Sequence, residues 1–198
     1  MDAHIERLIG QRDYRGALEA LASEHGKALG RFCSGLLGSR SDAEEALQEA
    51  LIHALNAMPG YRGEGVRAWV FGIARNVCAT ELKKRTRRRS VWGRVFGMSE
   101  DEVVRPLDDA DARMSIDKAL VRLSPGLREA LLLRYQQGMD ATEVADVLGI
   151  SHAAARKRIS LGLARLRTTL DLTSATLSAS AARPSARPVE DGLRGEQP

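Results

Sequence analysis

The sequence predicts an all-α protein of two small helical domains joined by an acidic linker. Only 4% of the 198 residues are aromatic, whereas the strands of sandwiches and barrels favour Val, Ile, Tyr and Phe. The chain is 43% hydrophobic, which is enough to build a core and excludes disorder throughout. Its charge, +4 overall, is segregated into basic and acidic blocks, which indicates separate modules.

Residues 1–97 are predicted to form the first domain. Apolar residues at helical spacing indicate two short amphipathic helices and a longer third one. Ser41 or Asp42 is expected to cap the next helix. Residues 59–65 contain Pro59 and several glycines, so they are predicted to form a loop. A long helix is expected to begin near Val66 and to run into a basic block.

The charge pattern defines a linker between two basic blocks. Residues 83–94 carry seven basic and no acidic side chains, and residues 151–167 carry five basic and none acidic. Residues 98–113, the predicted linker, hold six acids around Pro106. A single basic block would be expected simply from the solvent-exposed face of a helix. Two such blocks favour two modules that touch a polyanion.

Residues 114–172 are predicted to form the second domain, which contains a helix-turn-helix. Asp140 and Glu143 have the spacing of a capping box, and Gly149 and Ser151 supply a tight turn and a second cap. Basic residues near the start of the second helix are typical of a major-groove reader. An ordinary helical hairpin is the alternative. Residues 173–198, with three of the six prolines and no aromatic residue, are predicted to be a disordered tail.

The second helix of this motif has an inward apolar stripe, made of Ala155, Ile159, Leu163, Leu166 and Leu170. At 100° per residue, Lys157, Ser160 and Leu161 then point away from the core. Arg156 and Arg158 flank the stripe on opposite sides, and geometry alone does not choose between them.

Several classes of function lack their sequence marks. The four histidines are scattered, Cys33 and Cys78 stand alone, and no glycine loop ends in Lys-Ser or Lys-Thr. We therefore expect no enzyme activity, no cofactor and no metal. No apolar run is long enough to cross a bilayer and the first residues lack a signal-peptide pattern. The expectation is a cytoplasmic protein without membrane insertion.

Two separate blocks resemble the extracytoplasmic-function (ECF) sigma factors of bacteria. The segments DAEEALQE (42–49) and VRAWVFGIARN (66–76) resemble their region 2. The segment LSPGLREALLLRY (123–135) resembles the start of region 4, and the match continues through EVA (143–145) and LGIS (148–151). The matching parts cover about two thirds of the chain in the order that the family shows. The resemblance implies a factor that directs core RNA polymerase to promoter DNA.

The resemblance also implies a division of labour. The helix over 42–58 would dock on core RNA polymerase, and its candidate residues are Asp42, Glu45, Gln48 and Glu49. The following loop and helix would read and open the −10 element, through Tyr61, Arg62, Arg67, Trp69, Arg75, Asn76, Lys83 and Lys84. The helix-turn-helix would read the −35 element, through Arg156, Lys157 and Ser160.

Some of these assignments have structural alternatives. Phe71 is expected in the core, whereas Tyr61 and Trp69 are open between core and DNA contact. In the family, the position that matches Arg156 is usually basic and lies among the −35 contacts. The resemblance therefore implies that Arg156, on its flank of the apolar stripe, contacts bases. Arg158, on the opposite flank, is left as a candidate for a phosphate contact. Members are commonly held by an anti-sigma factor, so such a partner is implied.

The chain departs from the family pattern in three places. The loop from Arg62 to Trp69 is one residue shorter than usual, which leaves the −10 base preference open. Leu161 stands where many members have a basic residue, and the tail is longer than the family minimum. The alternative function is a helix-turn-helix regulator that does not replace the polymerase specificity subunit. It explains the second domain but not the blocks at 42–49 and 69–76.

Overall fold

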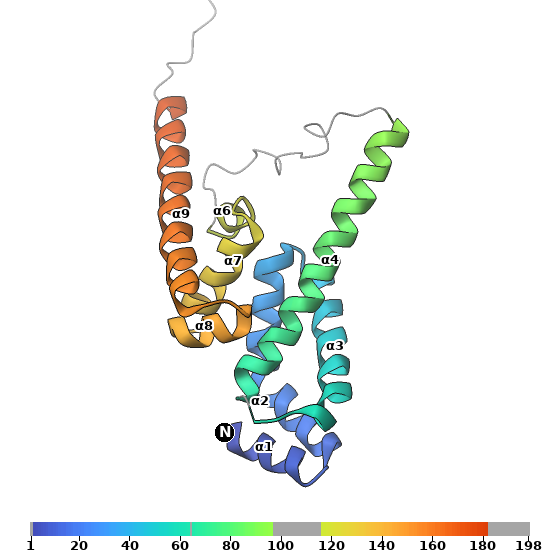
Figure 1. Cartoon of the computed structure of the whole chain (residues 1–198). Coiled ribbons are helices and arrows are strands. Elements are labelled where there is room, and N and C mark those ends of the chain that lie inside the picture. The colour runs from blue at the N-terminus through green and yellow to red at the C-terminus, as the bar shows by residue number, and fades with distance from the viewer. Residues whose placement is uncertain (1, 64, 97–115, 182–198) are drawn as a thin grey trace, which may run out of the picture.

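The computed structural model describes residues 2–63, 65–96 and 116–181, and all regular elements in these ranges are helical (Figure 1). The predicted all-α fold is therefore confirmed. The elements of the first part of the chain are α1 (Asp2–Gly10), α2 (Tyr14–Leu37), α3 (Arg40–Ala57), η1 (Met58–Gly60) and α4 (Val66–Phe96). Those of the second part are α6 (Ile116–Val121), α7 (Pro125–Leu131), η2 (Leu132–Gln136), α8 (Ala141–Leu148) and α9 (His152–Ala181). The predicted linker, residues 98–113, lies outside the described residues.

Local capping determines where α2 and α3 meet. Gly38 ends α2 in the left-handed conformation, with φ of 67°, and its N–H donates to the carbonyl of Ser34. The cap of α3 is Ser39, whose Oγ accepts from the N–H of Asp42 at 3.4 Å. The prediction of Ser41 or Asp42 as the cap was therefore wrong. Because Gly38 already turns the chain, α3 begins at Arg40, two residues before Asp42, the first acidic residue of the helix.

The core of the first domain is built on two phenylalanines. Phe32 of α2 and Phe71 of α4 are both fully buried, and their rings meet edge to face with centroids 5.4 Å apart. The expectation that Phe71 belongs to the core is confirmed. The buried side of α3 consists of Ala43, Ala46, Ala50 and Ala54. These small side chains let α3 lie close against α2.

The helix-turn-helix is formed by α8 and α9, with the predicted caps. Asp140 Oδ1 accepts from the N–H groups of Thr142 and Glu143 at 2.7 and 2.9 Å, and Glu143 Oε2 accepts from the N–H of Asp140 at 2.8 Å. Gly149 ends α8 with φ of 61°. Ser151 Oγ accepts from the N–H of Ala154 at 3.2 Å and caps α9.

We expect the cap of α8 to weaken only when the pH falls below the ordinary pKa of an aspartate. The N–H groups of Glu143, first, and of Thr142 hold the pKa of Asp140 below its usual range. A lowered folded-state pKa means that the stabilisation is present above the ordinary pKa and is lost as the pH falls through the lowered one. The amide proton shifts of Thr142 and Glu143, followed by NMR, should titrate below about pH 3.9. Asp140→Asn, which keeps the cap, should abolish this titration. A midpoint at or above the ordinary value would contradict the assignment.

The last helix extends further than expected. α9 continues to Ala181, so residues 173–181 are helical where the composition predicted a disordered tail. The reason is that the first proline after Leu172 is Pro184, and adding residues to an existing helix avoids the unfavourable nucleation step. Residues 182–198 lie outside the described part of the chain. None of the described helices is long and apolar enough to span a membrane.

The two domains pack directly against each other. α4 contacts α8, and α2 contacts α6, α7 and η2, so that the second domain lies along one side of the first (Figure 1). Buried apolar side chains from both domains form one continuous cluster. The order of the helices along the chain does not predict this contact between the domains. The contact determines which of the candidate residues are accessible.

Candidate functional site

The start of α9 presents an open polar surface. Arg156, Lys157 and Ser160, the three −35 candidates, are all exposed there. Leu161 beside them is 42% exposed, as its outward position in the sequence pattern predicts. Arg158 is half-buried, and its guanidinium lies over Gly126 at the start of α7, within 3.5 Å of where a Cβ would stand. Arg158 therefore faces its own domain more than Arg156 does.

The outer face of α3 is acidic with one apolar residue. Glu45, Gln48 and Glu49 are exposed. Ile52 is 59% exposed and follows Gln48 by one helical turn, so it extends the same face. Sequence reasoning missed Ile52, although its i+4 spacing from Gln48 was the available signal.

Asp42 differs from the other polymerase-docking candidates. It is half-buried and forms an ion pair with Arg85 of α4. Arg85 also donates to the carbonyl of Leu37 at 3.0 Å and lies 3.7 Å from Glu81. Asp42 is therefore part of the contact between α3 and α4, while the other three candidates face outward.

Tyr61 and Trp69 stabilise the loop before α4. The Tyr61 hydroxyl donates to Glu6 Oε1 at 2.7 Å and accepts from the N–H of Gly65 at 3.0 Å. The two aromatic rings meet edge to face with centroids 5.1 Å apart, and both side chains are half-buried. Tyr61 thus joins the loop to α1 and orients Trp69.

The remaining −10 candidates fall into two groups. Arg62, Asn76, Lys83 and Lys84 are exposed. Arg67 and Arg75, in contrast, face the second domain. Arg67 donates to the carbonyl of Gln137 and lies 3.6 Å from Glu143 Oε1. Arg75 Nε lies 3.0 Å from Glu129 Oε2. The structure therefore does not bring the eight candidates onto one open surface.

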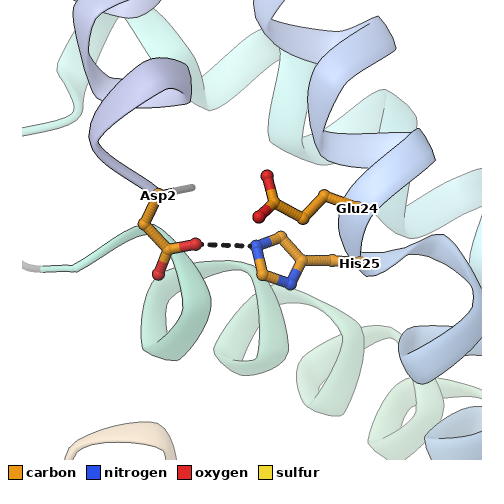
Figure 2. Close-up of side chains that lie close together, drawn as sticks. All are labelled: Asp2, Glu24 and His25. Carbon is orange, nitrogen blue, oxygen red and sulfur yellow. Dashed lines mark hydrogen bonds and ion pairs between the residues drawn. The ribbon is translucent and has the colours of Figure 1, made fainter.

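One group of side chains has donor atoms that a metal ion could use. Asp2, Glu24 and His25 place one such atom each within 4.8 Å of one another (Figure 2). His25 Nε2 lies 3.0 Å from Asp2 Oδ1, and the imidazole is largely buried. This hydrogen bond joins α1 to α2 and accounts for the position of His25 without an ion.

The two cysteines, isolated in the sequence, lie together in the first domain. Both are fully buried, Cys33 on α2 and Cys78 on α4. The hydrogen bond with Cys33 and then burial raise the pKa of the Cys78 thiol far above its ordinary value. Cys78 is thus packed in the core as a small, largely apolar side chain.

Comparisons with known proteins match both parts of the chain to one family. The family model "Sigma-70 region 2" matches residues 21–88, and the model "Sigma-70, region 4" matches residues 113–166. The ECF RNA polymerase sigma factor SigL of Mycobacterium tuberculosis is 30% identical over 171 residues, which cover 84% of this chain and 96% of SigL. The RNA polymerase sigma factor CnrH of Cupriavidus metallidurans is 28% identical over 170 residues, covering 80% and 88%.

Solved structures show the same fold. CnrH in complex with the cytosolic domain of CnrY superposes with a TM-score of 0.63 at 25% identity, covering 85% of this chain and 98% of that one. RpoE of Bartonella quintana, in complex with the anti-sigma factor NepR, gives 0.59 at 25% identity, covering 73% and 91%. With both sigma regions matched in order and a relative similar over nearly its whole length, the chain belongs to the ECF RNA polymerase sigma factors.

Proposed function

We propose that this sigma factor binds core RNA polymerase through the outer face of α3 and recognises the −35 element through the start of α9. The observation that supports both assignments is exposure. Glu45, Gln48, Glu49 and Ile52 on α3 are open, as are Arg156, Lys157 and Ser160 on α9. An acidic surface with one apolar residue suits a basic protein partner, whereas a basic helix start suits the major groove.

The −10 element is assigned to α4 and the loop before it. The exposed candidates Arg62, Asn76, Lys83 and Lys84 contact this element directly, and Arg67 and Arg75 join them once the second domain has moved away. Opening DNA costs about 1.4 kcal/mol per base-pair step, and one captured base returns about 1–3 kcal/mol. The polymerase therefore supplies most of the grip on the separated strands. Because the proposed partner, core polymerase, acts in the cytoplasm, we propose that this protein acts there as well.

An anti-sigma factor is proposed as a further partner. The relatives CnrH and RpoE were solved in complexes with the CnrY cytosolic domain and with the anti-sigma factor NepR. The exposed faces of α3 and α9 are the surfaces that such a protein would have to cover. A regulator that does not replace the specificity subunit is not favoured, because region 2 is matched as well as region 4.

Run-off transcription tests the proposal directly. Purified chain is added to core polymerase on genomic fragments, and start sites are mapped with and without the chain. New start sites that share upstream elements support the proposal. Sequence-specific binding to DNA without any start site that depends on the chain would favour the regulator instead.

Charge reversal on α3 should weaken binding to core polymerase. Glu45→Lys or Glu49→Lys is expected to raise the dissociation constant about tenfold, which corresponds to about 1.4 kcal/mol. Both side chains are exposed, so the fold should remain intact. The measurement is fluorescence anisotropy with labelled core polymerase. Glu19→Lys on α2 makes the same charge change at another exposed helix position and is the control. Unchanged affinity in both α3 variants would remove α3 as the docking surface.

A further inference from the structure

The loop before α4 is fixed at its two ends by the core. Met58 and Val66 are buried, with 1% and 0% of their surfaces exposed. Between them the backbone takes positive φ angles at Gly63 and Gly65, 84° and 90°. In the described part of the chain, no neighbouring atom lies within 4 Å of a Cβ added at either glycine. Because packing does not confine this backbone, its conformation depends on hydrogen bonds.

Tyr61 makes the hydrogen bonds that span the loop. Its N–H donates to the carbonyl of Met58 at 3.1 Å, and its hydroxyl accepts from the N–H of Gly65 at 3.0 Å. The carbonyl of Gly65 in turn accepts from the N–H of Trp69 at 3.0 Å, in the first turn of α4. The ring of Tyr61 also meets that of Trp69 edge to face. Tyr61 thus connects the end of η1 to the first turn of α4.

The orientation of the Tyr61 hydroxyl is determined by α1. A phenol hydroxyl has one proton to donate, and Tyr61 donates it to Glu6 Oε1 at 2.7 Å. Because the acceptor is a carboxylate, this hydrogen bond is stronger than one between two neutral groups. It leaves the lone pairs of the hydroxyl for the N–H of Gly65. Glu6 therefore holds the hydroxyl in the orientation that Gly65 requires.

α1 is itself firmly attached to the first domain. Ile5 and Ile9 are buried in the core, and Asp2 Oδ1 lies 3.0 Å from His25 Nε2 of α2 (Figure 2). α1 also contacts α4 (Figure 1). It precedes residues 21–88, which the region 2 model matches. The loop is therefore supported by a helix that lies outside the matched region.

We propose that Glu6 is a positioning residue for −10 recognition, which acts through Tyr61 on the start of α4. The inference rests on the proposed assignment of the −10 element to α4 and the loop before it. Trp69 is partly exposed, and Arg62, next to Tyr61, is open. Bases stack on exposed aromatic rings, so the placement of these side chains determines which −10 base fits best. Tyr61 then supports the residues that read the base and does not read it itself.

Glu6→Ala tests this role through base preference. It should reduce the ratio of transcription from the preferred −10 sequence to transcription from single −10 substitutions by about 3- to 10-fold, the scale of one hydrogen bond. The measurement is run-off transcription by the holoenzyme, from promoters at the mapped start sites. Loss of the negative charge acts on the DNA backbone and therefore on all promoters alike, which leaves this ratio unchanged. The preference at the −35 element should also stay unchanged.

Two further variants separate positioning from general stability. Glu6→Gln keeps an acceptor oxygen for Tyr61 and should retain most of the wild-type preference. Asp2→Ala is the matched control, because it removes a carboxylate of the same helix that bonds to α2 and not to the loop. It should leave the −10 ratio unchanged. An equal shift in Asp2→Ala and Glu6→Ala would show that α1 is merely loosened, and would overturn the proposal.

Tyr61→Phe tests the route of the effect. It removes the hydroxyl and retains the ring against Trp69. The −10 ratio should shift as in Glu6→Ala, and the double variant should shift it no further, because both changes break one chain of hydrogen bonds. Additive shifts would show that the Tyr61 hydroxyl contacts DNA itself, and would overturn the indirect role. If circular dichroism shows that Glu6→Ala is unfolded, Glu6→Asp replaces it, since it keeps the charge and withdraws the carboxylate by one methylene.

The exchange rate of the Gly65 amide proton, measured by NMR, reports the same contact without DNA. It should rise several-fold in Glu6→Ala and in Tyr61→Phe and stay at the wild-type value in Asp2→Ala. Unchanged exchange in Glu6→Ala would overturn the contact, and faster exchange with an unchanged −10 ratio would overturn the positioning role. A wild-type chain that gives no start sites would reject the proposed function and with it the −10 role of Glu6. Start sites with an unchanged ratio in Glu6→Ala would reject this inference alone.

Discussion

Arg128→Met is expected to lower the free energy of unfolding by about 3–5 kcal/mol. The guanidinium is buried, with 7% of the residue exposed. It donates to the carbonyls of Leu120 and Leu36 at 2.8 Å, to that of Leu123 at 3.1 Å and to that of Val121. Burial lowers the pKa of Arg128, so these acceptors offset part of the cost of holding the cation there.

The cost of Arg128→Met comes from unpaired carbonyl groups near the ends of α6 and α2. The last carbonyls of a helix have no partner within it. Arg128 satisfies carbonyls at the end of α6 and one in the last turn of α2, where a positive charge is also favourable. Methionine fills a similar volume but leaves these carbonyls unpaired. Lysine is expected to rescue little, because a single ammonium cannot reproduce the planar fork.

Chemical denaturation followed by circular dichroism measures the effect. Arg134→Met is the matched control, since Arg134 is exposed and donates to the carbonyl of Met139 at 2.8 Å. It should change the unfolding free energy by less than about 1 kcal/mol. A loss below 1 kcal/mol for Arg128→Met would show that water replaces the guanidinium at these carbonyls.

Arg156→Ala is expected to relax the preference for one base pair of the −35 element by about 5- to 150-fold, equivalent to about 1–3 kcal/mol. Arg156 is exposed at the start of α9, where a recognition helix contacts base edges. An arginine that reaches a guanine discriminates between bases, whereas one that meets phosphate does not. Run-off transcription from promoters with single −35 substitutions measures the preference.

Variants of two neighbouring residues, Lys157 and Arg158, are measured for comparison with Arg156→Ala. Lys157→Ala should either relax one position or weaken all promoters alike, according to whether Lys157 meets a base or a phosphate. Arg158→Ala should weaken promoters evenly, because Arg158 is the phosphate candidate on the opposite flank of the helix, and a phosphate contact carries no base preference. If Arg156→Ala lowers every promoter equally, Arg156 is not a base reader and the assigned orientation of α9 is wrong.

The sequence was most informative where structure is local. The capping box of Asp140 and Glu143, the turn at Gly149 and the cap at Ser151 depend on residues within one or two helical turns. It was less informative where two local signals compete. Ser39 was missed as the cap of α3, because the start of a helix also depends on how the preceding helix ends at Gly38.

The −10 candidates show the limit of sequence reasoning for a site. Helical spacing indicates which side of α4 is buried, and it placed Phe71 correctly in the core. It does not indicate what covers the remaining sides. Asp42 likewise has the same residue type as its exposed neighbours, but Arg85 reaches it from α4. Such pairings join residues far apart in the chain and leave no periodic signal.

By itself, the sequence determined the helical class, the order of two family regions and the outward position of Arg156, Lys157 and Ser160 on α9. These properties follow from composition, caps and the 3.6-residue period, all of which act over short distances along the chain. Only the tertiary structure decided that the two domains touch and that Arg67 and Arg75 meet Glu143 and Glu129. The physical reason is that an ion pair between domains depends on how two separately folded surfaces fit together, and neither surface encodes the other in its own spacing.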